Sequence, residues 1–184
     1  SVAVVGGGPI GLAISLVAKD LGAGQVITVG TRAESLTLAR QLGCDAKINI
    51  TEQDLVASIN DLTHGEGADI VYEAVGGNAP TLAQAVSVCA RGGRIGITGS
   101  FLKPQALDAL MAMRKELTVR WVWSYGMWRG VPEYKLALDL LSRGRLQASP
   151  LITHRFPLDR ISEAFAAADD KRASGAVKVL VIPK

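Results

Sequence analysis

The chain has 184 residues, of which 48% are hydrophobic and 20% charged, and its formal net charge is +3. This length buries a full core and this composition is that of a folded domain, which excludes a disordered or fibrous chain. Because no apolar run is long enough to cross a bilayer and no basic, apolar leader opens the sequence, we expect a cytoplasmic protein without membrane partners.

A glycine-rich turn follows the first apolar run. Val2–Val5 predicts a strand, Ile10–Leu21 predicts a helix, and a GxGxxG pattern spans residues 6–11 between them. In a parallel-sheet crossover, such a turn lets backbone N–H groups approach a pyrophosphate at the helix N-terminus. A turn that only packs a helix against a strand would carry the same pattern. The predicted cofactor contacts are Gly6, Gly8 as the N-cap, Pro9 at the first helical position, Ile10 and Gly11.

The end of the second strand, Gln25–Val29, carries a further signal. Folds that bind NAD place Asp or Glu there to accept from the ribose 2′-OH, whereas this chain has Gly30, Thr31 and Arg32. Glycine leaves room for a 2′-phosphate and the guanidinium can pair with it, so these residues predict NADP(H) as the cofactor. The alternative is that Thr31 and Glu34 form a capping box for the helix that runs to Leu42.

Strand and helix signals alternate along the chain with short connections, which predicts an α/β fold of the Rossmann type. The six expected strands are Val2–Val5, Gln25–Val29, Ala46–Ile50, Asp69–Glu73, Gly93–Thr98 and Leu117–Trp123, and the later helices are Asp54–Leu62, Thr81–Ala90 and Leu107–Met113. The right-handed crossover rule favours a doubly wound parallel sheet with the order 3-2-1-4-5-6 and the cofactor between strands one and four.

Small residues stand where the fourth, fifth and sixth strands end. Their size permits close approach of a ribose and a nicotinamide ring, although turn geometry alone also selects glycine in such loops. The predicted contacts in this half of the crevice are Ala74, Val75, Gly76, Thr98, Gly99, Ser100, Val122 and Ser124.

The stretches VAVVGGGPIGL, VITVGTR, GEGADIVYEAVGG, ARGGRIGITGS, KELTVRW and LITHRFPLDRISEAF resemble the medium-chain dehydrogenase/reductase superfamily, within it the zinc-dependent alcohol, polyol and threonine dehydrogenases. The similarity runs over essentially the whole chain, and its GTR segment resembles members that use NADP. The resemblance implies a preceding substrate domain that carries the zinc ligands and the proton relay, which this sequence lacks.

Metal and nucleophile candidates are few. Cys44, Cys89, His64 and His154 show no metal-ligand spacing, and we expect structural roles for all four, the cysteines as small buried side chains. We therefore predict no catalytic and no metal-binding residue in this chain, with zinc confined to the absent domain.

Charge is divided unevenly along the sequence. Residues 1–91 carry five basic and nine acidic side chains, whereas residues 92–184 carry fifteen and eight. The basic residues form no compact stripe with interleaved aromatic residues, so we expect no nucleic-acid partner.

All three tryptophans fall within residues 121–128. Alternation places Trp121, Trp123 and Tyr125 on one face of the last strand, which is a sheet edge, and an apolar edge needs a cover. In the resembling family this edge pairs with its two-fold mate. We predict a homodimer, or a tetramer built from it, through residues 117–128.

The resemblance divides the chain into a dinucleotide-binding domain, residues 1–145, and a segment, residues 146–184, that returns to the substrate domain. An unpaired strand at Ala176–Ile182 would expose its backbone, unless it packs on this domain. The predicted function is the NADP(H)-binding domain of an alcohol or polyol dehydrogenase that transfers hydride to or from a small alcohol or carbonyl substrate. The alternatives are a zinc-free quinone or enone reductase and a non-catalytic nucleotide-binding domain.

Overall fold

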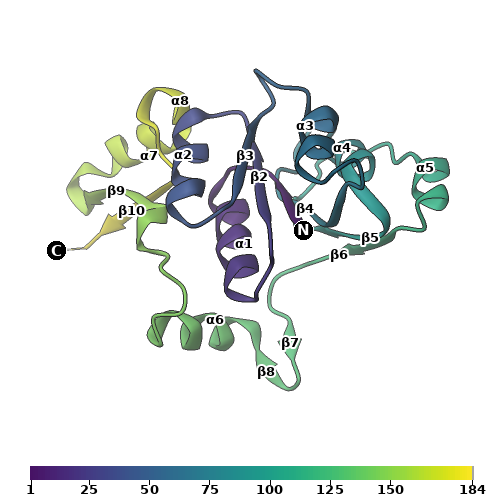
Figure 1. Cartoon of the computed structure of the whole chain (residues 1–184). Helices are drawn as coiled ribbons and strands as arrows, with labels where there is room; N and C mark the ends of the chain where they lie inside the picture. The colour runs from purple at the N-terminus through teal and green to yellow at the C-terminus, as the bar shows by residue number, and fades with distance from the viewer. Residues whose placement is uncertain (184) are drawn as a thin grey trace.

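A computed structural model describes residues 1–183, and its centre is a six-stranded parallel sheet with the order β3-β2-β1-β4-β5-β6 (Figure 1). The strands are β1 Val2–Val5, β2 Val26–Gly30, β3 Ala46–Asn49, β4 Ala68–Glu73, β5 Cys89–Ile97 and β6 Thr118–Trp121. The connecting helices are α1 Pro9–Asp20, α2 Ala33–Gln41, α3 Leu55–Leu62, α4 Thr81–Val88 and α5 Ala109–Arg114. The predicted Rossmann-type fold and strand order are confirmed.

Two apolar layers cover the sheet. On one face, Leu55 and Ile59 of α3 and Val86 of α4 pack against alternate residues of the strands. On the other face, Leu12 of α1 and Leu38 of α2 do the same. Burial on both faces is why the central strands read as continuous apolar runs.

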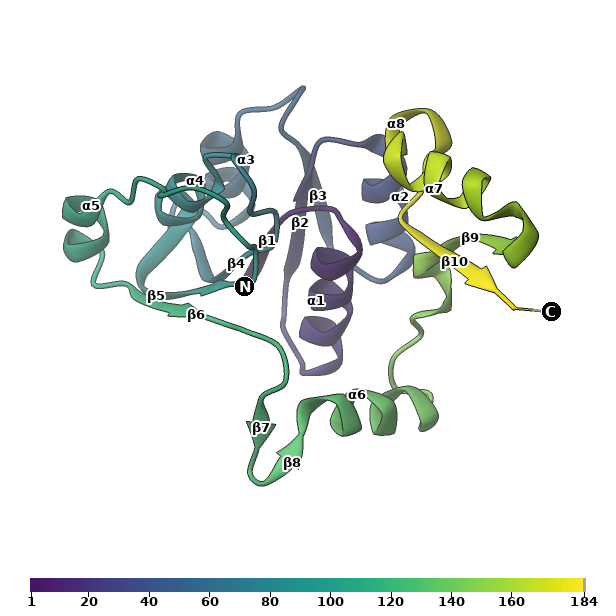
Figure 2. The ribbon, with the colours of Figure 1, turned by 180° about the vertical axis from the view of Figure 1, so that it is seen from behind.

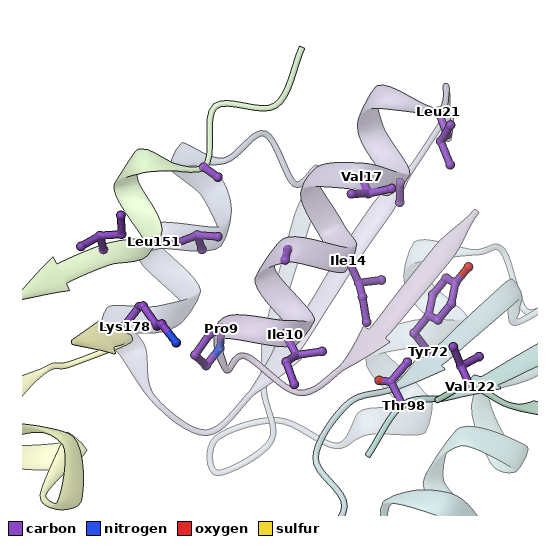
Figure 3. A pocket seen from close by; sticks show the side chains of 14 residues that line it. Pro9, Ile10, Ile14, Val17, Leu21, Tyr72, Thr98, Val122, Leu151 and Lys178 are labelled. Carbon is purple, nitrogen blue, oxygen red and sulfur yellow. The ribbon is translucent and has the colours of Figure 1, made fainter. Parts of the chain in front are cut away.

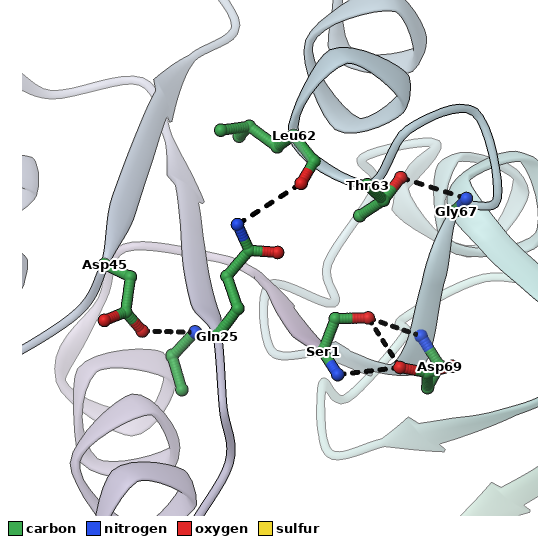
Figure 4. Close-up of polar contacts among 8 residues, drawn as sticks. Ser1, Gln25, Asp45, Leu62, Thr63, Gly67 and Asp69 are labelled. Carbon is green, nitrogen blue, oxygen red and sulfur yellow. Dashed lines mark hydrogen bonds and ion pairs between the residues drawn. The ribbon is translucent and has the colours of Figure 1, made fainter.

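Polar contacts fix the edge of the sheet at which β1 and β4 begin (Figure 4). The backbone N–H of Val26 donates to the Asp45 carboxyl at 2.7 Å, and the side-chain amide of Gln25 donates to the Leu62 carbonyl at 3.3 Å. At the turn before β4, the Gly67 N–H donates to the Thr63 hydroxyl at 3.0 Å. The opposite edge, where the strands end, is built from the glycine-rich loops.

The rest of the chain lies outside the main sheet. A hairpin of β7 Met127–Trp128 and β8 Val131–Pro132 leads into α6 Glu133–Ser142. The C-terminal lobe then consists of the short 3-10 turns Ser149–Leu151 and Leu158–Arg160, β9 Ile152–Pro157, α7 Ile161–Asp169, α8 Lys171–Ser174 and β10 Lys178–Ile182. Figure 2 shows this lobe beside α2, on the far side of the molecule from α5.

Four expected boundaries of the main sheet and its connecting helices are wrong by two residues or more. Two of them are starts: the strand expected to begin at Gly93 begins at Cys89, and the helix expected to begin at Leu107 begins at Ala109. The helix expected to reach Ala90 ends at Val88, and Cys89 begins β5. Lys115 explains this end, because its amino group donates to the carbonyls of Val86, Ser87 and Cys89 at 3.2, 2.8 and 2.7 Å. The strand expected to reach Trp123 ends at Trp121, since the chain then leaves the sheet for the hairpin.

Candidate functional site

The glycines of the first turn have different structural roles. Gly6 has φ +129°, and a Cβ there would lie 2.9 Å from the Ala74 carbonyl oxygen. A Cβ on Gly11 would lie 1.8 Å from the Gly6 carbonyl oxygen, so only glycine lets α1 pack on the turn. A Cβ on Gly8 meets no atom within 4 Å. Gly6 and Gly11 are therefore needed by the fold, whereas Gly8 leaves open space.

The N-terminus of α1 opens beside this turn. As predicted, Gly8 is the N-cap and Pro9 occupies the first turn. The cap provides no side-chain hydrogen bond, so the first-turn N–H groups remain available to an anion, with the helix dipole aligned toward it.

A pocket of about 320 Å³ joins the first turn to the ends of β2 and β4. It lies at the edge where the sheet order reverses, the usual place for a nucleotide in such folds. Its lining residues are Val5, Gly6, Gly7, Gly8, Val29, Gly30, Thr31, Arg32, Ser35, Ile50, Ala74, Val75, Ala79 and Thr81. Of these residues, Arg32 alone carries a charge, and no carboxyl group stands at the end of β2.

The capping box considered as the alternative for Thr31 and Glu34 does not form. Arg32, not Thr31, is the N-cap of α2, and no side chain caps this helix. Gly30 is the last residue of β2 rather than the first residue after it, because its carbonyl accepts from the Ile50 N–H beyond β3. The alternative explanation for Thr31 and Glu34 is therefore wrong, and Thr31 stands exposed at the pocket.

Arg32 has a second set of partners that the sequence did not predict. Its Nη1 donates to the Ala176 carbonyl at 2.9 Å and to the Lys171 carbonyl at 3.2 Å, both in the C-terminal lobe. The side chain is half-buried and lines the pocket at the same time. Guanidinium has five N–H donors, so Nε and Nη2 can still meet an anion.

Of the eight contacts predicted for the nicotinamide half, four lie in two neighbouring hollows, whereas Ala74 and Val75 line the pocket at the glycine turn. Thr98, Gly99, Ser100 and Val122 line a hollow of about 470 Å³ at the ends of β5 and β6. Pro9, Ile10, Thr98 and Val122 line a longer groove of about 710 Å³, which Figure 3 shows between α1 and the side chains of Tyr72, Thr98 and Val122. Gly76 packs against the Ser100 backbone, whereas Ser124 is exposed and lines none of these hollows.

Sequence reasoning missed Lys178. This lysine is the first residue of β10, and its side chain extends toward Pro9 (Figure 3). It lines both the groove and a hollow of about 240 Å³ shared with Pro9 and Lys171. The available signal was a single lysine at the start of an otherwise apolar strand, but the position of that lysine beside α1 depends on the tertiary fold.

The remaining candidates do not form a reactive centre. Among residues 1–183, no three His, Cys, Asp or Glu side chains are grouped as a metal site requires, so this part of the chain does not fit zinc. Burial raises the pKa of the Cys89 thiol to about 11, with Lys115 opposing this shift, and burial also raises the pKa of Cys44. Both thiols are buried, as predicted, whereas His64 is exposed and His154 is half-buried.

None of the helices in the described part of the chain combines the length and apolar character needed to cross a membrane.

Comparison with known proteins gives consistent results. The family model of the zinc-binding dehydrogenases matches residues 9–143. L-threonine 3-dehydrogenase of Bacillus licheniformis is 36% identical, covering 99% of this chain and 51% of that protein. A putative zinc-binding dehydrogenase from Sinorhizobium meliloti, solved bound to NADP, is 30% identical in sequence, and its structure matches with a TM-score of 0.85. The match covers 100% of this chain and 52% of the chain of that protein.

A further solved structure holds the other nicotinamide cofactor. An alcohol dehydrogenase from Escherichia coli CFT073, complexed with NADH, is 27% identical with a TM-score of 0.84, covering 98% of this chain and 51% of its own. The chain spans about half the length of the curated relatives it matches.

Proposed function

Because this chain belongs to the zinc-binding dehydrogenases of the medium-chain dehydrogenase/reductase superfamily, we propose that it is the NADP(H)-binding part of an alcohol or polyol dehydrogenase. The observation that carries the proposal is the pocket at the glycine turn, which combines an open helix N-terminus with Gly30 and Arg32 and has no carboxyl group. The relatives of this chain include a threonine dehydrogenase and a sorbitol dehydrogenase, which supports a small alcohol as the substrate class.

The chain's own residues would bind and orient the dinucleotide. The open space at Gly8 and the first turn of α1 receive the pyrophosphate, and Lys178 adds a nearby positive charge. Thr31 and Arg32 face the adenosine ribose. The small residues at the ends of β5 and β6 admit the nicotinamide half. The cofactor itself supplies the hydride chemistry.

Arg32 is the reason for proposing NADP(H) rather than NAD(H). Solved relatives hold either cofactor, so the family alone does not set the preference. A guanidinium held at the pocket by two carbonyl acceptors is already oriented for a 2′-phosphate. Gly30 stands where folds that bind NAD have a carboxyl group, which would repel that phosphate.

Calorimetric titration of the complete protein with NADPH and NADH tests this function. We expect NADPH to bind at least about tenfold more tightly, and Arg32→Ala to weaken NADPH binding by about 1.5–3 kcal/mol, the range for a hydrogen bond to a charged group. NADH affinity should change little in this variant.

Arg40→Ala is the matched control. Arg40 lies on α2, the helix that begins after Arg32, and it also donates to two carbonyls, those of Cys44 and Asp45. It lines none of the pockets described above. We expect it to leave the preference for NADPH unchanged. Equal affinity of the wild type for both cofactors would overturn the NADP(H) assignment. If Arg32→Ala lowered the affinities for NADPH and NADH equally, the role of Arg32 would be to hold the C-terminal lobe and not to select the cofactor.

The organisation of the whole protein follows from the same proposal. Residues 1–145 form the dinucleotide-binding unit, and residues 146–184 connect it to a substrate domain, which corresponds to the other half of the relatives' length. We assign the metal ligands and the proton relay to that half and no zinc-dependent step to this chain. Two copies pair through residues 117–128, where Trp121, Trp123 and Tyr125 are 64%, 77% and 92% exposed.

A further inference from the structure

Glu73 is a fully buried acid at the centre of the sheet. It is the last residue of β4, paired with Val5 of β1 and Ile97 of β5, and its exposure is 0%. A buried carboxyl group costs free energy unless hydrogen bonds replace its lost water, so its partners reveal what it does.

One carboxyl oxygen of Glu73 organises the loop after β4. Its Oε1 accepts hydrogen bonds from the backbone N–H groups of Val75 and Gly76, both at 2.9 Å, and from the Thr81 hydroxyl at 2.7 Å. Because Thr81 begins α4, this single atom fixes the path of the chain from β4 to that helix.

The backbone of Glu73 holds the neighbouring loop after β5. Its carbonyl accepts from the N–H groups of Thr98 and Gly99 at 2.8 and 3.2 Å, and from the Thr98 hydroxyl at 2.9 Å. The Gly77 N–H then donates to the Ser100 carbonyl at 2.8 Å. The two loops therefore form one hydrogen-bonded wall with Glu73 behind it.

This wall has no free space. A Cβ on Gly99 would lie 2.3 Å from the Glu73 Oε2, and a Cβ on Gly76 would lie 2.5 Å from the Ser100 nitrogen. Oε2 itself is buried without a hydrogen-bond partner in the part of the chain that the structure describes. An unpaired buried oxygen lowers stability, so stability does not by itself account for an acid here.

We propose that Glu73 is a positioning residue for the dinucleotide. Its side chain lines none of the hollows of the site, but its hydrogen bonds hold the wall that lines them. In this wall, Val75 and Thr81 line the pocket at the glycine turn, and Thr98, Gly99 and Ser100 line the adjoining hollow. The inference rests on the proposed function, because it requires that a nicotinamide dinucleotide occupies these hollows. It does not depend on which of the two cofactors is preferred.

Four variants of the complete protein separate positioning from general stability. Glu73→Ala removes the acceptor, Glu73→Gln keeps an acceptor oxygen of the same size, and Thr81→Val removes one donor. Thr63→Val is the matched control, because Thr63 is also a buried threonine, and its hydroxyl organises the loop at the other end of β4 (Figure 4). For each variant, the affinities for NADPH and NADH and the midpoint of thermal unfolding are measured.

We expect Glu73→Ala to weaken both cofactors by about tenfold or more, and Thr81→Val by about threefold to fivefold, because the wall loses its preorganised shape. Glu73→Gln should stay within about twofold of the wild type, since its oxygen accepts the same three hydrogen bonds. Thr63→Val should lower the unfolding midpoint as Thr81→Val does and leave both affinities unchanged. Where Glu73→Ala does not fold, Thr81→Val and Glu73→Gln carry the test.

Two results would overturn the inference. One is a Glu73→Gln protein that binds the cofactors as poorly as Glu73→Ala does, because the three hydrogen bonds that Gln keeps would then not determine affinity. Where Glu73→Ala does not fold, Thr81→Val takes its place in this comparison. The other is a Thr63→Val protein that loses as much affinity as Thr81→Val. A wild type that binds neither cofactor would instead contradict the proposed function, before any variant is compared.

Discussion

At the scale of single residues, the three glycines of the first turn differ although the pattern treats them alike. Gly6 and Gly11 are required because a Cβ would collide with a backbone carbonyl, whereas Gly8 has φ −81° and ψ −179°, an ordinary extended conformation. Neither backbone conformation nor packing in the described structure requires glycine at residue 8.

Gly8→Ala and Gly11→Ala test this division. We expect Gly8→Ala to leave the midpoint of thermal unfolding nearly unchanged and to weaken dinucleotide binding by about tenfold, since its methyl group stands where the pyrophosphate approaches. Gly11→Ala should lower the unfolding free energy by about 1–3 kcal/mol or more, because the added carbon overlaps the Gly6 carbonyl. Full cofactor affinity in Gly8→Ala would show that the open space at Gly8 is not used.

Arg32 shows where residue-level reasoning stops. Its position after β2 predicted an anion contact, and it does line the pocket. Its carbonyl partners, Lys171 and Ala176, lie about 140 positions later in the sequence. Because such partners meet only after the lobe has folded, no local pattern could reveal them.

At the scale of elements, the buried strands were predictable, and so was the edge strand β6 except for its end. Val2–Val5 forms β1 with the predicted bounds, because a strand buried on both faces must be apolar throughout. The alternation expected through Tyr125 breaks at Trp121, and Tyr125 has φ +68° on the way to the hairpin. The aromatic stripe is therefore not part of a core, and Trp121 and Trp123 are exposed.

Asp45 links four elements, since it lies between α2 and β3, accepts a hydrogen bond from β2 and pairs with a lysine of α1. Partial burial tends to raise the pKa of its carboxyl, but the hydrogen bond from the Val26 N–H and the ion pair with Lys19 outweigh this and lower it below 3.8. A pKa that is lower in the folded state adds stability above the unfolded value, and this stability is lost as the pH falls through the folded value.

Asp45→Asn should therefore flatten the acid side of the stability curve. We expect the free energy of unfolding to fall less between about pH 6 and about pH 3 in the variant than in the wild type, measured by denaturant titration at each pH. Asp61→Asn, at an exposed acid on α3, serves as the control and should keep the wild-type slope. Identical slopes in all three proteins would contradict the assignment to Asp45.

At the scale of the whole molecule, the C-terminal strand is not left unpaired. β10 pairs in parallel with β9, and Ala176 and Val177 just before it are buried, Val177 in the core layer under α1 and α2. The lobe is thus joined to the sheet domain by apolar packing and by Arg32. A two-stranded parallel sheet still has two open edges, which agrees with the proposed connection to a further domain.

The proposed dimer is tested by sedimentation of the complete protein at micromolar concentration. We expect the wild type to sediment as a dimer or tetramer, and Trp121→Glu to weaken this association because a charge would be buried at the interface. Tyr134→Glu, an aromatic residue on α6 that is 75% exposed, is the control and should not change the mass. A wild type that sediments only as a monomer would contradict an interface at residues 117–128.

The sequence by itself determined the strand order, the glycine turn and the apolar layers. These depend on local periodicity, on turn residues and on the handedness of crossovers, all of which act between neighbouring elements. Only the tertiary structure decided that Thr31 is not a cap, that Arg32 and Lys178 lie where the C-terminal lobe meets the rest of the fold, and that Glu73 stands behind two loops. These facts depend on contacts between residues far apart in the chain, and such contacts exist only once the core has brought the elements together.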